Sequence, residues 1–125
     1  VGVDVEQIRA LDHLQLASRF FAAEEVAALR DLPPGALVGA FFDCWTRKEA
    51  YVKALGTGLQ TPLSSFAVSL RPGESVALLR TSPAQAGPWR LYDLGPGSEY
   101  AAALVTEGAP GVIVKRTLVP AGGRP

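Results

Sequence analysis

Apolar residues follow a helical spacing through the first half of the chain. They recur three and four positions apart over 15–21, over 22–32 and from residue 34 to about 55, which predicts two short helices and one long helix. A Pro-Pro-Gly stretch at 33–35 separates the second helix from the third, and a Gly-Thr-Gly stretch at 56–58 ends the third. The pattern therefore predicts three consecutive helices before residue 60.

The long helix carries charged residues where a helix that only packs on a core does not need them. Its apolar residues fall on one stripe, and Lys48 lies in the middle of that stripe. Glu49 and Lys53 lie together at the edge of the stripe. Ordinary interpretations stay open: Lys48 can lay its stem along apolar surface and reach water, and Glu49 and Lys53 fit a solvated i,i+4 pair.

After Pro62 the period changes from helical to two, which is typical of strands. The strands predicted from this alternation, together with the opening residues, are 1–5, 66–71, 76–81, 89–94, 100–106 and 112–118. Helices early and antiparallel strands late predict one α+β domain, in which an antiparallel sheet packs against one long helix and short helices. We expect this domain to span 1–119 and to end in a loose tail, 120–125.

Composition narrows the classes of function. The chain has 125 residues, enough for one domain with a modest core, and its twelve basic and twelve acidic residues cancel. This balance gives no electrostatic reason to expect a nucleic acid or a membrane as partner. With no membrane-length apolar run and no signal peptide in the sequence, we expect a cytoplasmic location. One histidine, His13, and one cysteine, Cys44, make triad catalysis improbable. We expect Cys44 to be a core residue and His13 to have a structural or surface role.

The candidate chemistry rests on three carboxylates and two lysines. Asp4 and Glu6 lie two residues apart on the first strand and so share one face, and Glu49 supplies a third carboxylate from the long helix. Three hard oxygen ligands, with positions left for water and phosphate oxygens, are typical of Mg²⁺ sites. Lys48 and Lys53 would lie on those phosphates. Taken alone, Asp4 and Glu6 also fit the wet face of a strand.

The Gly-Thr-Gly stretch adds a second feature next to these charges. Gly56 and Thr57 offer backbone amides and little steric bulk, so a phosphate can approach the chain closely there. The same residues also fit a simple helix stop.

The arrangement of these residues resembles a known family. VGVDVE, followed about forty residues later by WTRKEAYVKALGTGL, resembles the paired signature of the 4′-phosphopantetheinyl transferase superfamily. The matching residues are Asp4, Trp45, Thr46, Lys48, Glu49 and Lys53. The resemblance extends through 19–21 and 61–68. Glu6 and Trp45 are similar to the Sfp type, built from two similar halves, of which this chain resembles the C-terminal one; the short trimeric holo-acyl-carrier-protein synthases are the other branch.

The resemblance implies transfer of 4′-phosphopantetheine from coenzyme A to a serine of an acyl or peptidyl carrier protein, as in polyketide, nonribosomal peptide and fatty acid biosynthesis. It assigns Mg²⁺ binding to Asp4, Glu6 and Glu49, catalysis to Glu49 and Lys53, and coenzyme A binding to Lys48, Lys53, Gly56 and Thr57. Glu49 is the candidate base for the incoming serine. In the Sfp type the site lies between the two halves, so the resemblance also implies an N-terminal half or self-association to complete the cleft.

Two other interpretations remain open at this stage. The chain begins at Val1 inside a predicted strand and has no methionine, so we expect it not to be a complete translation product. A non-catalytic half-domain that binds coenzyme A or a carrier protein and needs a missing N-terminal half is one alternative. An unrelated α+β domain with ordinary surface charges is the other. Dependence of activity on a metal distinguishes them from a transferase.

Overall fold

The computed structural model of the chain describes residues 1–56, 60–82, 87–95 and 99–108. Its helices are α1 (His13–Phe20), α2 (Ala23–Arg30) and α3 (Pro34–Leu55), with a short 3₁₀ turn, η2 (Leu63–Ser65). Its strands are β1 (Gly2–Gln7), β2 (Ala67–Val68), β3 (Leu78–Arg80), β4 (Trp89–Asp93) and β5 (Tyr100–Glu107). The predicted α+β class is confirmed, and the expected strand at 112–118 and tail at 120–125 lie outside the described residues.

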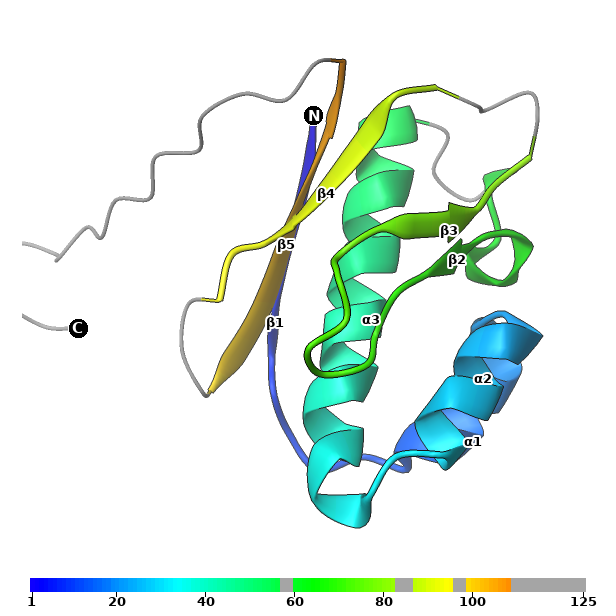
Figure 1. Ribbon diagram of the computed structural model, residues 1–125, viewed down its shortest axis with the longest axis vertical. Coiled ribbons are helices and arrows are strands. Elements are labelled where there is room, and N and C mark those ends of the chain that lie inside the picture. Colours follow the sequence, from blue (N-terminus) through cyan, green and yellow to red (C-terminus); the bar gives the residue numbers. More distant parts are fainter. Residues whose placement is uncertain (57–59, 83–86, 96–98, 109–125) are drawn as a thin grey trace, which may run out of the picture.

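The long helix α3 lies between two groups of elements (Figure 1). On one side is an antiparallel sheet with the order β1-β5-β4, and on the other are α1, α2 and the antiparallel β2–β3 hairpin. The ends of α3 follow local chemistry. Pro34 occupies the first turn, where its missing N–H costs nothing, and Gly56 closes the helix in the left-handed region at φ +71°.

Strand β1 packs on α3 at very short range. Gly2 lies so close to the helix that a Cβ atom there would stand 2.0 Å from the Ala50 carbonyl oxygen. Only glycine fits this contact. Asp4, two residues on, points the same way, and the opposite face of β1 is exposed.

The core is aromatic and centred on α3. Phe41 and Phe42 are fully buried, and the ring of His13 lies edge-on against both, with centroids 5.1 and 5.9 Å away. The His13 Nε2 is 3.1 Å from the Arg9 carbonyl oxygen, and Cys44 is fully buried. The core position expected for Cys44 is therefore confirmed, and His13, expected to be structural or on the surface, is buried against the core.

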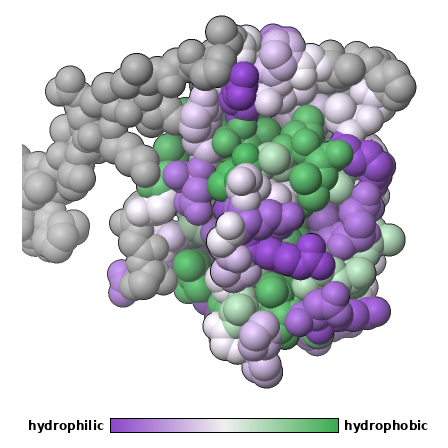
Figure 2. Space-filling model, in the orientation of Figure 1, coloured by the Kyte–Doolittle hydropathy of each residue, from purple (hydrophilic) through white to green (hydrophobic). Residues whose placement is uncertain are grey.

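The hairpin differs from the prediction. A strand was predicted over 66–71, yet β2 has only two residues, and every residue from Phe66 to Leu70 is buried. This segment is enclosed because the Phe66 ring packs at a tilt against Tyr51 of α3, with centroids 4.7 Å apart, while the Val68 amide donates to Glu25 of α2. Hydrophobic residues over the neighbouring β3 and β4 region reach the surface (Figure 2).

Candidate active site

The strand carboxylates and the long helix meet at the middle of β1. The even-numbered residues of β1 face α3, so Asp4 is only 6% exposed while Val3 and Val5 are exposed. Asp4 Oδ1 accepts a 2.8 Å hydrogen bond from Nζ of Lys53, which also donates to the Val3 carbonyl oxygen. The structure thus brings a strand acid and a helix lysine into direct contact over 49 residues of chain.

The other oxygen of Asp4 has no such donor. Among the side chains that the structure describes, Asp4 Oδ2 is the buried nitrogen or oxygen atom that lacks a hydrogen-bond partner. Glu6 can donate to the Asp4 carboxylate only in its protonated form, and this contact helps to raise the pKa of Glu6. An unpartnered carboxylate oxygen in a buried position is costly, which indicates a place for a cation.

Three carboxyl groups at this position act on one another. Burial raises the pKa of Glu49, and the charge of Asp4 raises it further, against a smaller lowering by Lys53. The pKa of Glu6 is raised by burial first and then by its contacts with Asp4. The Asp4 carboxylate raises the pKa of Lys53 through their hydrogen bond. Lys53 and Arg9, whose Nη1 lies 4.0 Å from Oε1 of Glu6, lie against these three carboxyl groups. Two cations against three carboxylates leave the cluster with an excess of negative charge.

The carboxylates do not form a finished metal site. Within the part of the chain that the structure describes, no group of three or more His, Cys, Asp or Glu side chains is arranged to hold a metal ion. The Lys53 ammonium forms an ion pair with one of the two Asp4 carboxylate oxygens, Oδ1. The donor set nevertheless fits Mg²⁺, because it consists of hard oxygen atoms and one of them, Asp4 Oδ2, is buried without a partner.

A pocket of about 540 Å³ opens beside these charges. One wall is the last two turns of α3, where Glu49, Val52, Lys53 and Gly56 line it. The other wall is the 61–63 segment, hereafter the second wall. Gly56, expected to bind coenzyme A, lines the pocket, and its role stays a prediction. Thr57 lies outside the described residues. A small anionic ligand in this pocket would contact Lys53 directly.

Lys48 lies elsewhere. We expected it to run along the edge of the apolar stripe and to reach phosphate, but its side chain is 0% exposed and its Nζ lies 2.7 Å from Oε1 of Glu25. It also donates to the Phe66 carbonyl oxygen. The physical reason is geometric: a lysine in the centre of a buried stripe cannot reach water, so it requires a buried carboxylate. The structure does not bring Lys48 to Asp4 or Glu49.

Two features of the site were missed in the sequence. Glu25 lies in the first turn of α2, where the helix dipole favours an acid, and it is only 2% exposed. The second wall was noted only as part of the family resemblance. The position of Lys48 was the signal for a buried partner, because a buried ammonium needs a buried acid. Seven of the twelve acids precede Lys48, so this signal does not by itself select Glu25.

Comparison with known proteins defines the class. The family model of the 4′-phosphopantetheinyl transferase superfamily matches residues 1–105, and the chain belongs to this superfamily. It is 39% identical over 109 residues to the 4′-phosphopantetheinyl transferase HetI of a Nostoc species, covering 86% of this chain and 44% of that protein. It is 29% identical over 101 residues to Sfp of Bacillus subtilis, covering 81% and 45%. The chain thus spans about half the length of these relatives.

A solved structure shows the same fold. The chain superposes with a TM-score of 0.68 on a holo-(acyl-carrier-protein) synthase from Bacillus anthracis in complex with CoA, at 23% identity. The match covers 86% of this chain and 95% of that one. At this identity the likeness concerns the fold, and the predicted phosphopantetheinyl transferase fold is confirmed.

Proposed function

We propose that the protein transfers 4′-phosphopantetheine from coenzyme A to a serine of an acyl or peptidyl carrier protein, in a Mg²⁺-dependent reaction. The observation that carries this proposal is the buried Asp4 carboxylate, with one oxygen bound to Lys53 and the other without a partner, beside a pocket lined by Glu49. Membership of the superfamily supports the same reaction.

Each residue has a definite role in the proposal. Asp4, Glu6 and Glu49 would hold Mg²⁺, which when bound supplies Lewis-acid stabilisation of charge on phosphate oxygens. Lys53 neutralises phosphate charge from its place on the pocket wall, and the Gly56 backbone borders the phosphates with Thr57 next to it. Lys48 is left out of the binding set, because its ammonium is engaged by Glu25 and Phe66.

The transfer itself breaks one bond and forms one. The serine oxygen attacks the phosphorus that carries the pantetheine arm, the bond from that phosphorus to the bridging oxygen breaks, and 3′,5′-adenosine bisphosphate leaves. Glu49 takes the serine proton, directly or through one water. Its raised pKa suits this role, because a carboxyl group closer to neutrality is a better base than an ordinary surface glutamate.

We also propose that a second unit completes the cleft. The outward face of β1 presents Val1, Val3 and Val5 at 84%, 47% and 56% exposure, and Tyr100 of β5 is 44% exposed beside it. A row of exposed valines is typical of an interface. The unit is either an N-terminal half or a further copy, and we expect the chain alone to have little turnover.

The cytoplasmic location expected from the sequence stays a prediction. Within the described residues, no helix has the length and apolar character of a membrane span.

One observation favours the non-catalytic alternative. Lys53 forms an ion pair with Oδ1 of Asp4, and the described side chains form no group of three or more metal ligands. Coenzyme A binding without a metal is therefore the second candidate function.

The test is a transfer assay with a preparation that contains the completing unit, coenzyme A and an apo carrier protein, followed by mass spectrometry of the carrier. Transfer that requires Mg²⁺ and collapses in Asp4→Ala and Glu49→Ala, but not in Glu24→Gln, supports the transferase. Unchanged rates in the first two variants would sink the site assignment. Coenzyme A binding that ignores Mg²⁺, with no transfer, identifies the binding module instead.

A further inference from the structure

A fully buried ion pair joins α2 to α3. Glu25 of α2 and Lys48 of α3 are 1% and 0% exposed, and Nζ lies 2.7 Å from Oε1 and 2.9 Å from Oε2. Glu25 also accepts from the Ala22 and Val68 amides, and the Lys48 ammonium lies 4.0 Å from the centre of the Phe66 ring. Every donor and acceptor of the pair has a partner, so the pair is closed to any ligand.

The partners of this pair are spread over three elements. Glu25 comes from α2 and Lys48 from α3, whereas Phe66 and Val68 belong to the chain that leads directly out of the second wall. That segment is fastened twice, once by Lys48 to the Phe66 carbonyl oxygen and once by Glu25 to the Val68 amide. Three residues before Phe66, the same segment lines the pocket through Leu63.

The pair also sits next to the reacting end of the site in sequence. Lys48 precedes Glu49, and on a helix adjacent residues point about 100° apart. When Lys48 is fixed toward α2, Glu49 is directed to the flank where Asp4 and the pocket lie. The same buried ion pair therefore positions both walls of the pocket.

Stability alone does not account for such a pair. Removing two charges from water is expensive, and apolar side chains of similar volume are often as stabilising. What the pair supplies that apolar residues do not is directional bonding to two chosen backbone groups, the Phe66 carbonyl and the Val68 amide.

We propose that Glu25 and Lys48 are positioning residues of the active site, which hold the second wall against α3 at the distance that coenzyme A requires. For its effect on coenzyme A this inference rests on the proposed function. For its effect on the second wall it stands on the contacts alone.

The experiment measures both effects in the same proteins. Amide hydrogen exchange over 61–68, and calorimetric affinity for coenzyme A with Mg²⁺ in the presence of the completing unit, are compared in the parent, Lys48→Met, Glu25→Gln and the double variant Glu25→Gln/Lys48→Met. The double variant carries no charge at either position of the buried pair, so it remains informative if a single variant does not fold. Exchange in β5 serves as the internal reference for global opening.

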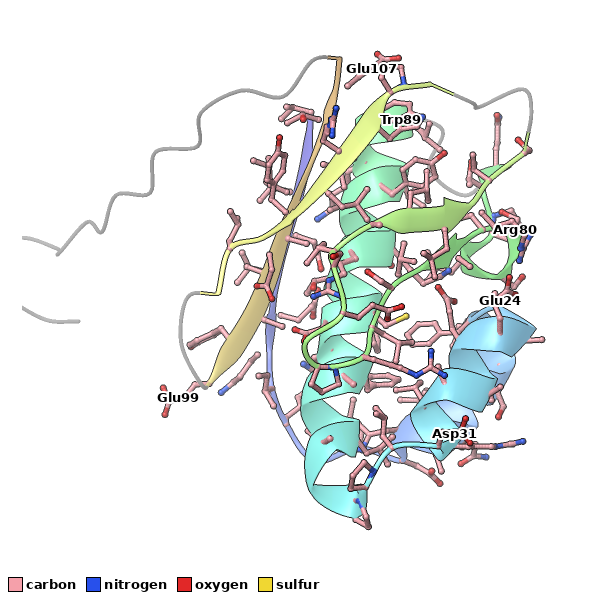
Figure 3. The ribbon with its side chains drawn as sticks, in the orientation of Figure 1. Glu24, Asp31, Arg80, Trp89, Glu99 and Glu107 are labelled. Carbon is pink, nitrogen blue, oxygen red and sulfur yellow. The ribbon has the colours of Figure 1, made fainter. Side chains whose placement is uncertain are left out.

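Glu24→Gln is the matched control. Glu24 is the neighbour of Glu25 on the same helix and takes the same substitution, but its pair with Arg80 is exposed (Figure 3), with Nε 2.7 Å from Oε2. Arg80 also donates to the Ser65 carbonyl oxygen. This variant therefore tests loss of a glutamate charge on α2, beside an exposed contact to the same segment, without disturbing the buried pair.

We expect exchange over 61–68 to become at least tenfold faster in the double variant while β5 stays protected, and coenzyme A affinity to fall at least tenfold, with Glu24→Gln unchanged. Parental exchange in the double variant would overturn the inference, and so would faster exchange with parental affinity. If the parent binds no coenzyme A even together with the completing unit, the proposed function fails, and the exchange data alone decide whether the pair holds the second wall.

Discussion

Lys48 and Lys53 lie five residues apart on α3, and each binds a carboxylate, yet the two ion pairs are built for opposite purposes. The Lys48–Glu25 pair is closed: both side chains are buried and every polar atom has a partner. The Lys53–Asp4 pair is open: the lysine is 52% exposed and one Asp4 oxygen has no hydrogen-bond partner. A closed pair holds the surrounding structure in place, and an open pair leaves a carboxylate oxygen available to a ligand.

The largest expected effect comes from breaking the closed pair. Lys48→Met removes the ammonium and leaves Glu25 buried beside an apolar chain, so the free energy of unfolding should fall by about 3–5 kcal/mol. Chemical denaturation at pH 7 measures it. A loss below about 1 kcal/mol, as for a surface pair, would contradict the description of this pair as closed and buried.

The second prediction breaks the open pair. Asp4→Asn keeps the size of the side chain but removes the charge that Lys53 and a metal share, so the transfer rate should fall by about 100-fold, or roughly 2.7 kcal/mol in the barrier. The transfer assay with the completing unit measures the rate, with Glu24→Gln as control. Equal losses in both variants would show that the effect is not specific to the site.

The two pairs also mark how far sequence reasoning extends. Helix α3 was predicted from Pro34 to about Leu55, and its bounds are confirmed, because proline and glycine act locally at its ends. The shared face of Asp4 and Glu6 follows from the period of a strand and is also observed. Both depend on neighbours in sequence.

What failed depends on distant partners. The fate of Lys48 is decided by Glu25, 23 residues away, and the enclosure of 66–70 is decided by α2 and α3 together. No local period records either contact. The short helices moved for a local reason instead. They were predicted at 15–21 and 22–32 but lie at His13–Phe20 and Ala23–Arg30, and the first begins earlier because Asp12 caps it by accepting from the Gln15 amide.

The third prediction sharpens the idea that Lys53 takes the place of a cation. Lys53→Met frees Asp4 Oδ1, so the affinity for Mg²⁺ without coenzyme A should rise by up to about tenfold, or roughly 1.4 kcal/mol. Calorimetric titration measures it. Coenzyme A affinity should fall in the same variant, because the pocket loses its cation. Weaker Mg²⁺ binding would show that Lys53 does not compete with the metal.

The smallest expected effect concerns pH. The pKa of Glu49 is raised in the folded protein above its ordinary 4.5, first by burial and then by Asp4. An acid with a raised folded pKa favours the folded state when protonated, so its contribution is fully present below about 4.5 and is lost as the pH rises through the folded value. At pH 7 the ionised Glu49 therefore costs stability, and because the group is partly exposed this cost should be under about 1 kcal/mol. Glu49→Gln should be more stable than the parent at pH 7 and no more stable at pH 4, measured by denaturation at both values. A gain of equal size at both pH values would show that the effect comes from packing. The excess of negative charge around the open pair would then not explain it.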